Sequence, residues 1–286
     1  MKQAILITAY TNLRYLTRII GWFDDDFDFY IHIDKKSQED YSFLEELSNV
    51  HVYKRYAIQW GSDRHLAAII YLIEQLLASK HQYDYCHLIT GADFPIKSCA
   101  EFKQFFTAQN ENNYIEYYPL PHAGWLPDGG LDRLRYYWIG HRCTDVRNSK
   151  WTSRILWLQR KLHIHRRLDF VPQLYGGGTY WSLKQEAVRY AYNRMMGRHG
   201  LWHHFAHSHI AEEIWMQSLI LNNPKFKVVN DYLRYMHWVG FAQSPCVLTD
   251  IEELPALLQS NAFFARKFVP GESDELLDAI VKHYQA

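Results

Sequence analysis

Ala4-Ile5-Leu6-Ile7-Thr8-Ala9-Tyr10 is the stretch of sequence that decides the fold we expect for this chain. An apolar run without alternating polar residues is typical of a strand that is buried on both faces of a parallel sheet. The run is far too short to span a bilayer, which takes about 20 apolar residues, and it lacks the layout of a signal peptide. We therefore interpret it as the first strand of an α/β sheet.

Strands and helices alternate along the rest of the first half. The sequence predicts strands over 29–33, 51–53 and 85–89, and helices over 13–22 and 62–77. Repeated strand–helix units imply a mostly parallel sheet with helices on both faces. Ligands of such sheets bind beyond the carboxyl ends of the strands. Ala9, Asp34 and Asp93 fall at those ends.

Composition narrows the class of protein. The chain has 286 residues, 48% of them hydrophobic, and can bury a substantial core. Its 31 acidic and 31 basic residues leave no net charge, which argues against a sequence-independent nucleic-acid binder. Cys86, Cys99, Cys143 and Cys246 have no CxxC spacing, so we expect reduced thiols and no metal site built from them. Because no apolar run reaches about 18 residues, we expect an intracellular chain without a transmembrane segment.

The middle of the chain is less regular. A strand expected over 112–118 and a loop over 119–141 precede a basic, Trp-bearing stretch with a helical pattern over 150–167. Such a helix fits a contact with RNA or anionic lipid. It is a single helix in a neutral protein, however, and runs of charge usually face water, so we favour a solvated helix.

Two motifs in the second half allow a structural and a functional interpretation. Tyr175-Gly176-Gly177-Gly178-Thr179-Tyr180-Trp181 holds three consecutive glycines, which occur where a chain turns sharply or approaches a ligand closely. We expect a turn that enters a strand over 179–183, and the motif is neither a Walker loop nor GxGxxG. Glu212 and Glu213 precede a helix expected over 213–221, and the helix dipole favours carboxylates at such a start.

Near the C-terminus, Arg266 and Lys267 stand among Phe263, Phe264 and Phe268. Removing two cations from water is unfavourable unless an anion binds to both of them. The planar fork of arginine and the point charge of lysine together match a diphosphate. The alternative is a surface helix end whose cations face water while the phenylalanines pack inward.

Six motifs, taken in order, resemble the core-2/I-branching β-1,6-N-acetylglucosaminyltransferases, a family that includes the peptide O-xylosyltransferases. They cover residues 29–37, 58–62, 91–96, 176–181, 211–213 and 263–268. The resemblance implies an inverting glycosyltransferase of GT-A-like fold that uses a UDP-sugar and needs no divalent metal or other cofactor. We expect one domain over 1–286, with a nucleotide-binding half over 1–110 and an acceptor and catalytic half over 111–286.

The resemblance also implies roles for individual residues. Glu213 matches the catalytic base. The positions that match donor contacts are Ala9, Asp34, Ile58, Gln59, Trp60, Thr179, Tyr180, Arg234, Ser244, Arg266 and Lys267. Asp93, Arg133 and Arg135 are candidates for binding the acceptor.

The residues that follow each glutamate favour Glu213 over Glu212 as the base. In the family pattern, two apolar or aromatic residues follow the base, and a small hydroxyl residue stands five positions on. Counting from Glu213 gives Ile214, Trp215 and Ser218. Because neighbouring residues of a helix point about 100° apart, we expect only one of the two glutamates to face the cleft.

Unlike its secretory-pathway relatives, the chain is expected to have no membrane anchor, and it has only four cysteines. We expect a bacterial, cytoplasmic member of the family, with peripheral contact to the membrane left open and no nucleic-acid partner. The Asp-x-Asp pattern within Asp24–Asp28 lies between a helix and a strand, so we interpret it as a solvated turn rather than a metal site. The transferred sugar, GlcNAc or xylose, and the carbohydrate or glycoconjugate acceptor stay open.

Two other functions remain as alternatives. An inverting glycoside hydrolase needs two carboxylates that flank the bond with room for a water, and Glu213 with Asp93 could form such a pair. A noncatalytic sugar- or nucleotide-binding protein would bind UDP without turnover. Glu213 would then only stabilise a helix start.

Overall fold

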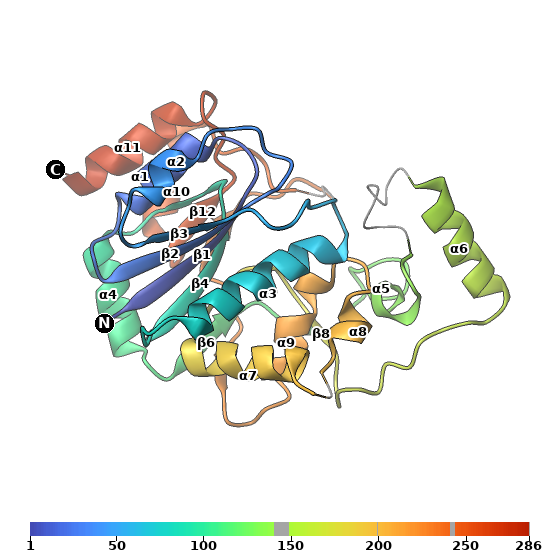
Figure 1. Cartoon of the computed structure of the whole chain (residues 1–286). Helices are drawn as coiled ribbons and strands as arrows, with labels where there is room; N and C mark the ends of the chain where they lie inside the picture. Colours follow the sequence, from blue (N-terminus) through green and yellow to red (C-terminus); the bar gives the residue numbers. More distant parts are fainter. Residues whose placement is uncertain (140–148, 199, 241–243, 286) are drawn as a thin grey trace.

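A seven-stranded sheet lies at the centre of the molecule (Figure 1), in the order β10-β6-β9-β4-β1-β2-β3. The computed structural model describes residues 1–139, 149–198, 200–240 and 244–285. The strands are β1 (Gln3–Ala9), β2 (Phe27–Ile33), β3 (Val50–Tyr53), β4 (Tyr85–Thr90), β6 (Asn112–Ile115), β9 (Trp181–Lys184) and β10 (Lys227–Val229). Only β9 runs antiparallel to its two neighbours, β4 and β6. The expected mostly parallel α/β sheet is confirmed.

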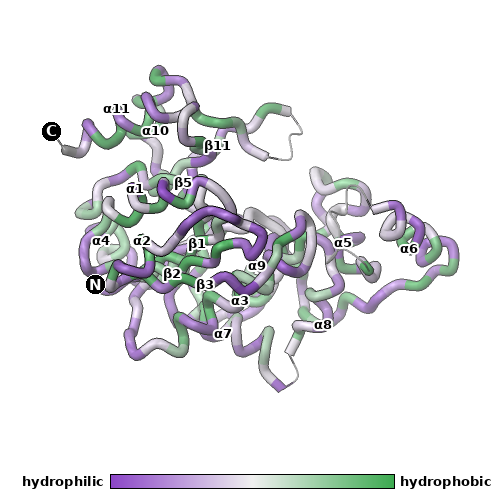
Figure 2. Tube along the Cα trace, turned by 45° about the horizontal axis from the view of Figure 1, so that its top comes forward, coloured by the Kyte–Doolittle hydropathy of each residue, from purple (hydrophilic) through white to green (hydrophobic). Residues whose placement is uncertain are grey.

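The apolar N-terminal run forms the strand that the sequence predicts. Every residue of β1 and of β2 is buried, and β1 is coloured as largely hydrophobic in Figure 2. Ile5 and Ile7 join the core on one face of the sheet, while Ala4 and Leu6 join the core on the other. A continuous apolar run therefore supplies both cores at once.

Helices cover both faces of the sheet. The core of Ala4 and Leu6 is completed by α3 (Asp63–Ala78), α7 (Gln185–Met196) and α9 (Trp215–Ile220). The core of Ile5 and Ile7 is completed by α1 (Leu16–Ile20), α2 (Ser42–Glu45), α4 (Cys99–Ala108), α10 (Leu254–Gln259) and α11 (Asp274–Gln285). The two faces thus hold separate cores, as a doubly covered sheet requires.

Smaller elements surround the carboxyl edge of the sheet. A three-stranded sheet consists of β11 (Arg234–Met236), β12 (Phe264–Arg266) and β5 (Asp93–Pro95), and a two-stranded sheet of β7 (Tyr118–Pro119) and β8 (Tyr175–Gly176). The remaining helices are α5 (Asp132–Arg135), α6 (Lys150–Lys161) and α8 (Trp202–Phe205), with short 3-10 turns η1 (Leu13–Tyr15), η3 (Ala211–Glu213) and η4 (Ile251–Glu253). No helix in the described part of the chain is long and apolar enough to cross a membrane.

Several element boundaries differ from the prediction. The helix expected over 13–22 is η1 followed by α1, the strand over 112–118 is split into β6 and β7, and the strand over 179–183 begins at Trp181. The helix over 150–167 ends at Lys161, because His163 takes a left-handed conformation (φ 53°) that a helix cannot continue. Cys86, Cys99 and Cys246 are free thiols, as expected; Cys143 lies outside the described residues.

Candidate active site

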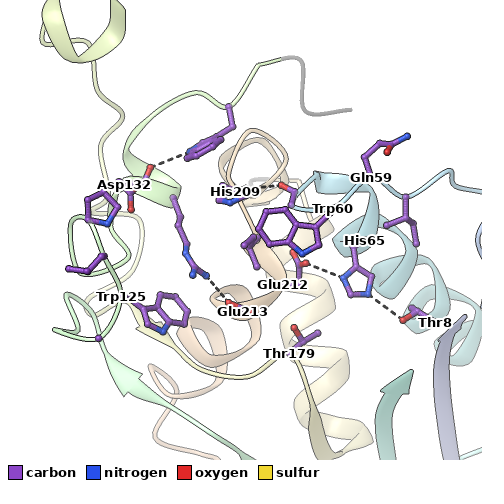
Figure 3. A pocket seen from close by; sticks show the side chains of 18 of the residues that line it. Thr8, Gln59, Trp60, His65, Trp125, Asp132, Thr179, His209, Glu212 and Glu213 are labelled. Atoms are coloured by element: carbon purple, nitrogen blue, oxygen red, sulfur yellow. Dashed lines mark hydrogen bonds and ion pairs between the residues drawn. The ribbon is translucent and has the colours of Figure 1, made fainter. Parts of the chain in front are cut away.

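A cavity of about 1170 Å³ opens at the carboxyl ends of β1 and β2. Thr8, Ala9 and Asp34 form its floor at the strand ends. The loop Ile58-Gln59-Trp60 and residues of η3 form its walls, as the labelled side chains of Figure 3 show. The position at the strand ends agrees with the general rule for ligand sites of open α/β sheets.

The expected donor contacts from the first half of the chain come together in this cavity. Ala9, Asp34, Ile58, Gln59 and Trp60 all line it. The Asp34 carboxylate accepts hydrogen bonds from the backbone N–H of Lys36 at 2.9 Å and of Ile58 at 3.2 Å. The bond from Ile58 fixes the 58–60 loop beside the end of β2. Each carboxylate oxygen has a further lone pair, so Asp34 can still accept a hydrogen bond from a ligand.

The glycine run makes a close backbone approach and thereby holds the opposite wall. The N–H of Gly177 donates to the carbonyl of Glu213 at 3.0 Å. A Cβ at Gly177 would lie 2.0 Å from the carbonyl oxygen of Glu116, so no other residue fits there. Thr179, just after the turn, lines the cavity, and Ser218 of α9 bonds the backbone of Tyr175 at 3.0 and 3.1 Å.

Glu212 and Glu213 both line the cavity, but the Glu212 side chain is only 7% exposed whereas that of Glu213 is 30% exposed. The expected helix start is instead the 3-10 turn η3, which follows a left-handed Ile210 (φ 48°) and breaks before α9. A tight turn between two backbone breaks directs the two side chains differently from successive residues of an α-helix.

The two carboxylates nevertheless differ in their surroundings. Glu212 Oε1 lies 3.0 Å from His65 Nδ1, and His65 Nε2 lies 3.3 Å from Thr8 Oγ1 (Figure 3). The other oxygen, Oε2 of Glu212, is buried and has no hydrogen-bond partner among the described residues. The hydrogen bond from His65 keeps the pKa of Glu212 low even though burial opposes this. Glu212 is therefore a fixed, ionised group inside the wall.

Glu213 is the more accessible carboxylate, with a side chain that is 30% exposed. Its Oε2 accepts a hydrogen bond from Arg133 at 2.7 Å, whereas Oε1 makes no hydrogen bond with any described residue. Burial raises the pKa of Glu213, and the charge of Arg133 partly offsets that rise. One carboxylate oxygen is thus held while the other is free to take a proton.

Of the two arginines expected on the acceptor side, the structure places only Arg133 in the cavity. Its guanidinium lies 3.8 Å from the ring centre of Trp125, which orients the fork toward Glu213. Arg135 forms an ion pair with Asp128 and lines a separate hollow with Arg166. The position of Arg135 favours a structural role.

Arg266 and Lys267 line a neighbouring hollow of about 510 Å³, which shares Thr8, Ala9 and Tyr10 with the large cavity. The segment is strand β12 rather than the helix end considered above, and the phenylalanines beside it are buried core. Arg266 is bonded to Tyr180 and to Thr90 Oγ1 (2.9 Å), and it is paired with Asp93 at 3.4 Å. Lys267, by contrast, forms no ion pair with any described residue.

Four further predicted contact residues line neither the cavity nor the hollow: Tyr180, which is bonded to Arg266, and Arg234, Ser244 and Asp93. Arg234 is buried and donates to the carbonyls of Leu88 and Trp181 at 3.1 and 3.2 Å, and burial lowers its pKa to about 10. Ser244 is exposed and lines neither the cavity nor the hollow. Asp93 is fully buried and also lines neither, so it cannot flank a sugar bond together with Glu213. These positions favour structural roles.

The Asp-x-Asp segment lies at the opposite, amino-terminal edge of the sheet. Asp24 and Asp26 both form ion pairs with Lys103, and β2 begins immediately afterwards. Within the described residues, no three His, Cys, Asp or Glu side chains form a group that could hold a metal ion.

Sequence reasoning missed the aromatic and histidine part of the site. Trp125, Trp138, His65 and His209 all line the cavity, and the rings of Trp138 and His209 stack 4.2 Å apart. They come from loops and helix starts that carry no periodic signal. Only the overall aromatic content of 16% hinted at a ring-lined cleft.

Comparisons with known proteins place the chain in a family. The family model "Core-2/I-Branching enzyme" matches residues 4–256. The "Xylosyltransferase oxt" of Drosophila pseudoobscura pseudoobscura is 24% identical over 267 residues, 85% of this chain and 28% of that protein. The "Xylosyltransferase" of Ciona intestinalis is 23% identical, over 94% of this chain and 32% of that protein. The chain therefore spans less than a third of the length of these relatives.

Among solved structures, S. aureus TarS 1-349 covers 99% of this chain and 65% of its own, at 9% identity and a TM-score of 0.43. The match to the family model extends over most of the chain and includes five of the six motifs. The chain belongs to the Core-2/I-Branching enzyme family.

Proposed function

We propose that this protein is an inverting glycosyltransferase that moves a sugar from a UDP-sugar to a hydroxyl of a glycan or glycoconjugate without a metal ion. The observation that carries the proposal is that one cavity is lined both by Asp34, at the strand ends, and by Glu213, whose carboxylate has one oxygen bonded to Arg133 and one oxygen without a hydrogen bond to any described residue. Family membership and the names of the relatives, which are xylosyltransferases, support the transferase class.

Glu213 is the proposed general base. In a single displacement, the acceptor oxygen forms a bond to the anomeric carbon as the bond from that carbon to the UDP oxygen breaks. The acceptor proton passes to Oε1 of Glu213, and UDP leaves with the bonding electron pair. Burial raises the pKa of Glu213, which strengthens it as a base, and the charge of Arg133 partly offsets that rise.

Lys267 is the proposed partner of the departing diphosphate. It lies in the hollow that adjoins the strand ends and is not engaged by a carboxylate of the described chain. Arg266 contributes positive charge to the same hollow while it is held by Tyr180 and Asp93. Fixed cations of this kind stabilise charge that develops on a leaving group. We therefore expect activity to survive excess chelator; loss in EDTA with recovery in manganese would contradict the metal-free assignment.

The size and lining of the cavity support a two-substrate reaction. Its volume of about 1170 Å³ exceeds the usual range of about 300–1,000 Å³ for a single small-molecule site. The rings of Trp60, Trp125 and Trp138 offer flat surfaces for sugars. Xylose is our first candidate for the transferred sugar because of the named relatives, and GlcNAc is the second.

A thermal-shift panel followed by a transfer assay tests the proposal. UDP, UDP-xylose, UDP-GlcNAc, UDP-glucose and UDP-galactose are compared, since a ligand at about 100 times its Kd stabilises the folded state by about 2.7 kcal/mol. We expect UDP and one UDP-sugar to raise the Tm, and that sugar to be transferred to an acceptor with inversion. Absence of any UDP effect would refute the donor assignment. Binding without turnover on an acceptor array would favour a noncatalytic binding protein.

A further inference from the structure

Helix α6 packs on the molecule through an unusually polar face. Its buried residues are Thr152, Leu156 and Gln159, which recur at helical spacing along one side. Gln159 bonds the backbone N–H and carbonyl of Tyr137 at 2.8 and 2.9 Å, and Thr152 bonds the carbonyl of Ile139 at 3.1 Å. In Figures 1 and 2 the helix lies at the edge of the molecule, away from the main sheet.

The apolar face of α6 points outward. Trp151 is 72% exposed and Trp157 is 60% exposed. Leu158 and Leu162 extend the same surface and are also exposed. At about 100° per residue, Trp157 and Leu158 lie opposite the buried face and Trp151 lies at its side, while Leu162 follows directly after the last helical residue. A surface helix of a globular protein normally buries its large apolar residues, whereas Trp151, Trp157 and Leu158 of this helix are exposed to solvent.

Cations are interleaved with these apolar side chains. Lys150, Arg154 and Lys161 share the outward face, where Arg154 lies over the ring of Trp151 at 5.8 Å and Lys161 over that of Trp157 at 5.0 Å. The chain as a whole has no net charge, yet no Asp or Glu occurs anywhere between residues 149 and 168. The local charge is therefore concentrated on this surface.

We propose that α6 docks this protein on the surface of an anionic lipid bilayer. Tryptophan rings favour the headgroup level of a bilayer, leucines enter the acyl boundary, and lysine and arginine meet the lipid phosphates. At about 1.5 Å per residue, the 12-residue helix is about 18 Å long, which is too short to span the hydrocarbon core of about 30 Å. It therefore lies along the surface. The charge complementarity selects anionic over zwitterionic lipid.

Docking through α6 would hold the candidate active site close to the lipid. The hydrogen bonds of Gln159 tie α6 to the segment that continues from α5, and α5 carries Arg133 of the cavity wall. Arg166, beyond the helix, donates its backbone N–H to the carbonyl of Arg135 at 2.7 Å. The wall of the cavity and the membrane-facing helix thus form one connected unit. An acceptor attached to a membrane lipid would then reach the cavity from the bilayer surface.

Vesicle co-sedimentation of the full chain tests the proposal. We expect binding to vesicles that mix phosphatidylcholine with phosphatidylglycerol, weak binding to pure phosphatidylcholine, and release at high salt. Trp151→Ser/Trp157→Ser and Lys150→Glu/Arg154→Glu/Lys161→Glu should each lower the partition coefficient at least about tenfold. Because all five side chains are exposed, circular dichroism and Tm should match those of the parent protein.

The matched control reverses three exposed cations elsewhere, in Lys80→Glu/Arg194→Glu/Lys282→Glu, and should bind like the parent protein. Three outcomes would overturn the proposal: no binding of the parent to anionic vesicles, equal loss in the control, or a parent dimer that the tryptophan variant dissolves while vesicle binding is absent. The last outcome would assign the face to a second copy of the chain. None of these readouts involves a nucleotide or sugar transfer, so the test succeeds or fails independently of the proposed activity.

Discussion

Replacing the carboxylate of Glu213 by an amide is the most direct perturbation of the proposed mechanism. Glu213→Gln keeps the size of the side chain and an oxygen that can accept from Arg133, but it removes the ionised group that takes the proton. A positioned base contributes about 10²–10⁴ in rate, so we expect transfer to fall at least ~100-fold. UDP affinity should be unchanged, since the uridine contacts proposed for Asp34 lie at the strand ends.

The structure also sets the expected effect on stability. The hydrogen bond of 2.7 Å from Arg133 joins two charges that are 18% and 30% exposed. Replacing the anion by a neutral acceptor weakens a charge-assisted bond without breaking it, which we expect to cost about 1 kcal/mol. For a chain of this size that corresponds to a fall in Tm of about 2–4 °C. A loss of activity much larger than this small destabilisation therefore reports on chemistry.

Glu212→Gln is the matched control, because it makes the same chemical change one residue away. Glu212 is held by His65 and its second oxygen is buried, so it cannot reach an acceptor hydroxyl. We expect its turnover to fall far less than that of Glu213→Gln. The assay is initial-rate transfer at saturating UDP-sugar, with UDP binding measured by calorimetry. Near-parental turnover of Glu213→Gln, or a dead Glu212→Gln, would refute the assignment of the base.

Three further predictions follow from the same contacts. Lys267→Ala should weaken UDP-sugar binding by about 1–3 kcal/mol in calorimetry and leave the circular dichroism spectrum unchanged. Arg266→Ala should weaken binding as well and also lower the Tm, because it removes the cation paired with the buried Asp93. Parental UDP affinity in both variants would contradict the diphosphate site. Because burial raises the pKa of Glu213 and Arg133 lowers it, Arg133→Ala should move the acid limb of the kcat–pH profile to higher pH, and an unmoved limb would argue against the ion pair. Burial lowers the pKa of His32 to about 4, so the protein should be fully stable above about pH 6.5 and should lose about 3 kcal/mol of its free energy of unfolding as the pH falls toward 4. Urea unfolding of the parent and of His32→Gln at both ends of this range measures the loss. The same change in the free energy of unfolding with pH in both proteins would refute the prediction.

The sheet could be predicted from the sequence because its signal is local and redundant. In β1 and β2 every residue is buried, so the apolar run records a strand covered on both faces. The short elements at the carboxyl edge were less predictable. The residues of η3 and α9 look like one helix in sequence, but a break at Ile214 separates them, and the left-handed Ile210 precedes η3. Tertiary contacts, here the bond from Gly177 to the carbonyl of Glu213, set such breaks, and they leave no periodic pattern.

The same reason explains which parts of the site the sequence missed. A motif marks a residue as unusual, but it does not say whether the side chain faces the ligand or supports the wall behind it. Arg234 and Lys267 are both cations near the C-terminus, yet one donates to carbonyls inside the protein and the other lies in an open hollow. Burial and existing partners make this distinction, because a cation already satisfied by the protein has little to gain from a phosphate. The cations that remain accessible at the carboxyl edge are therefore the ones whose removal should change the chemistry, and the buried ones those whose removal should change the fold.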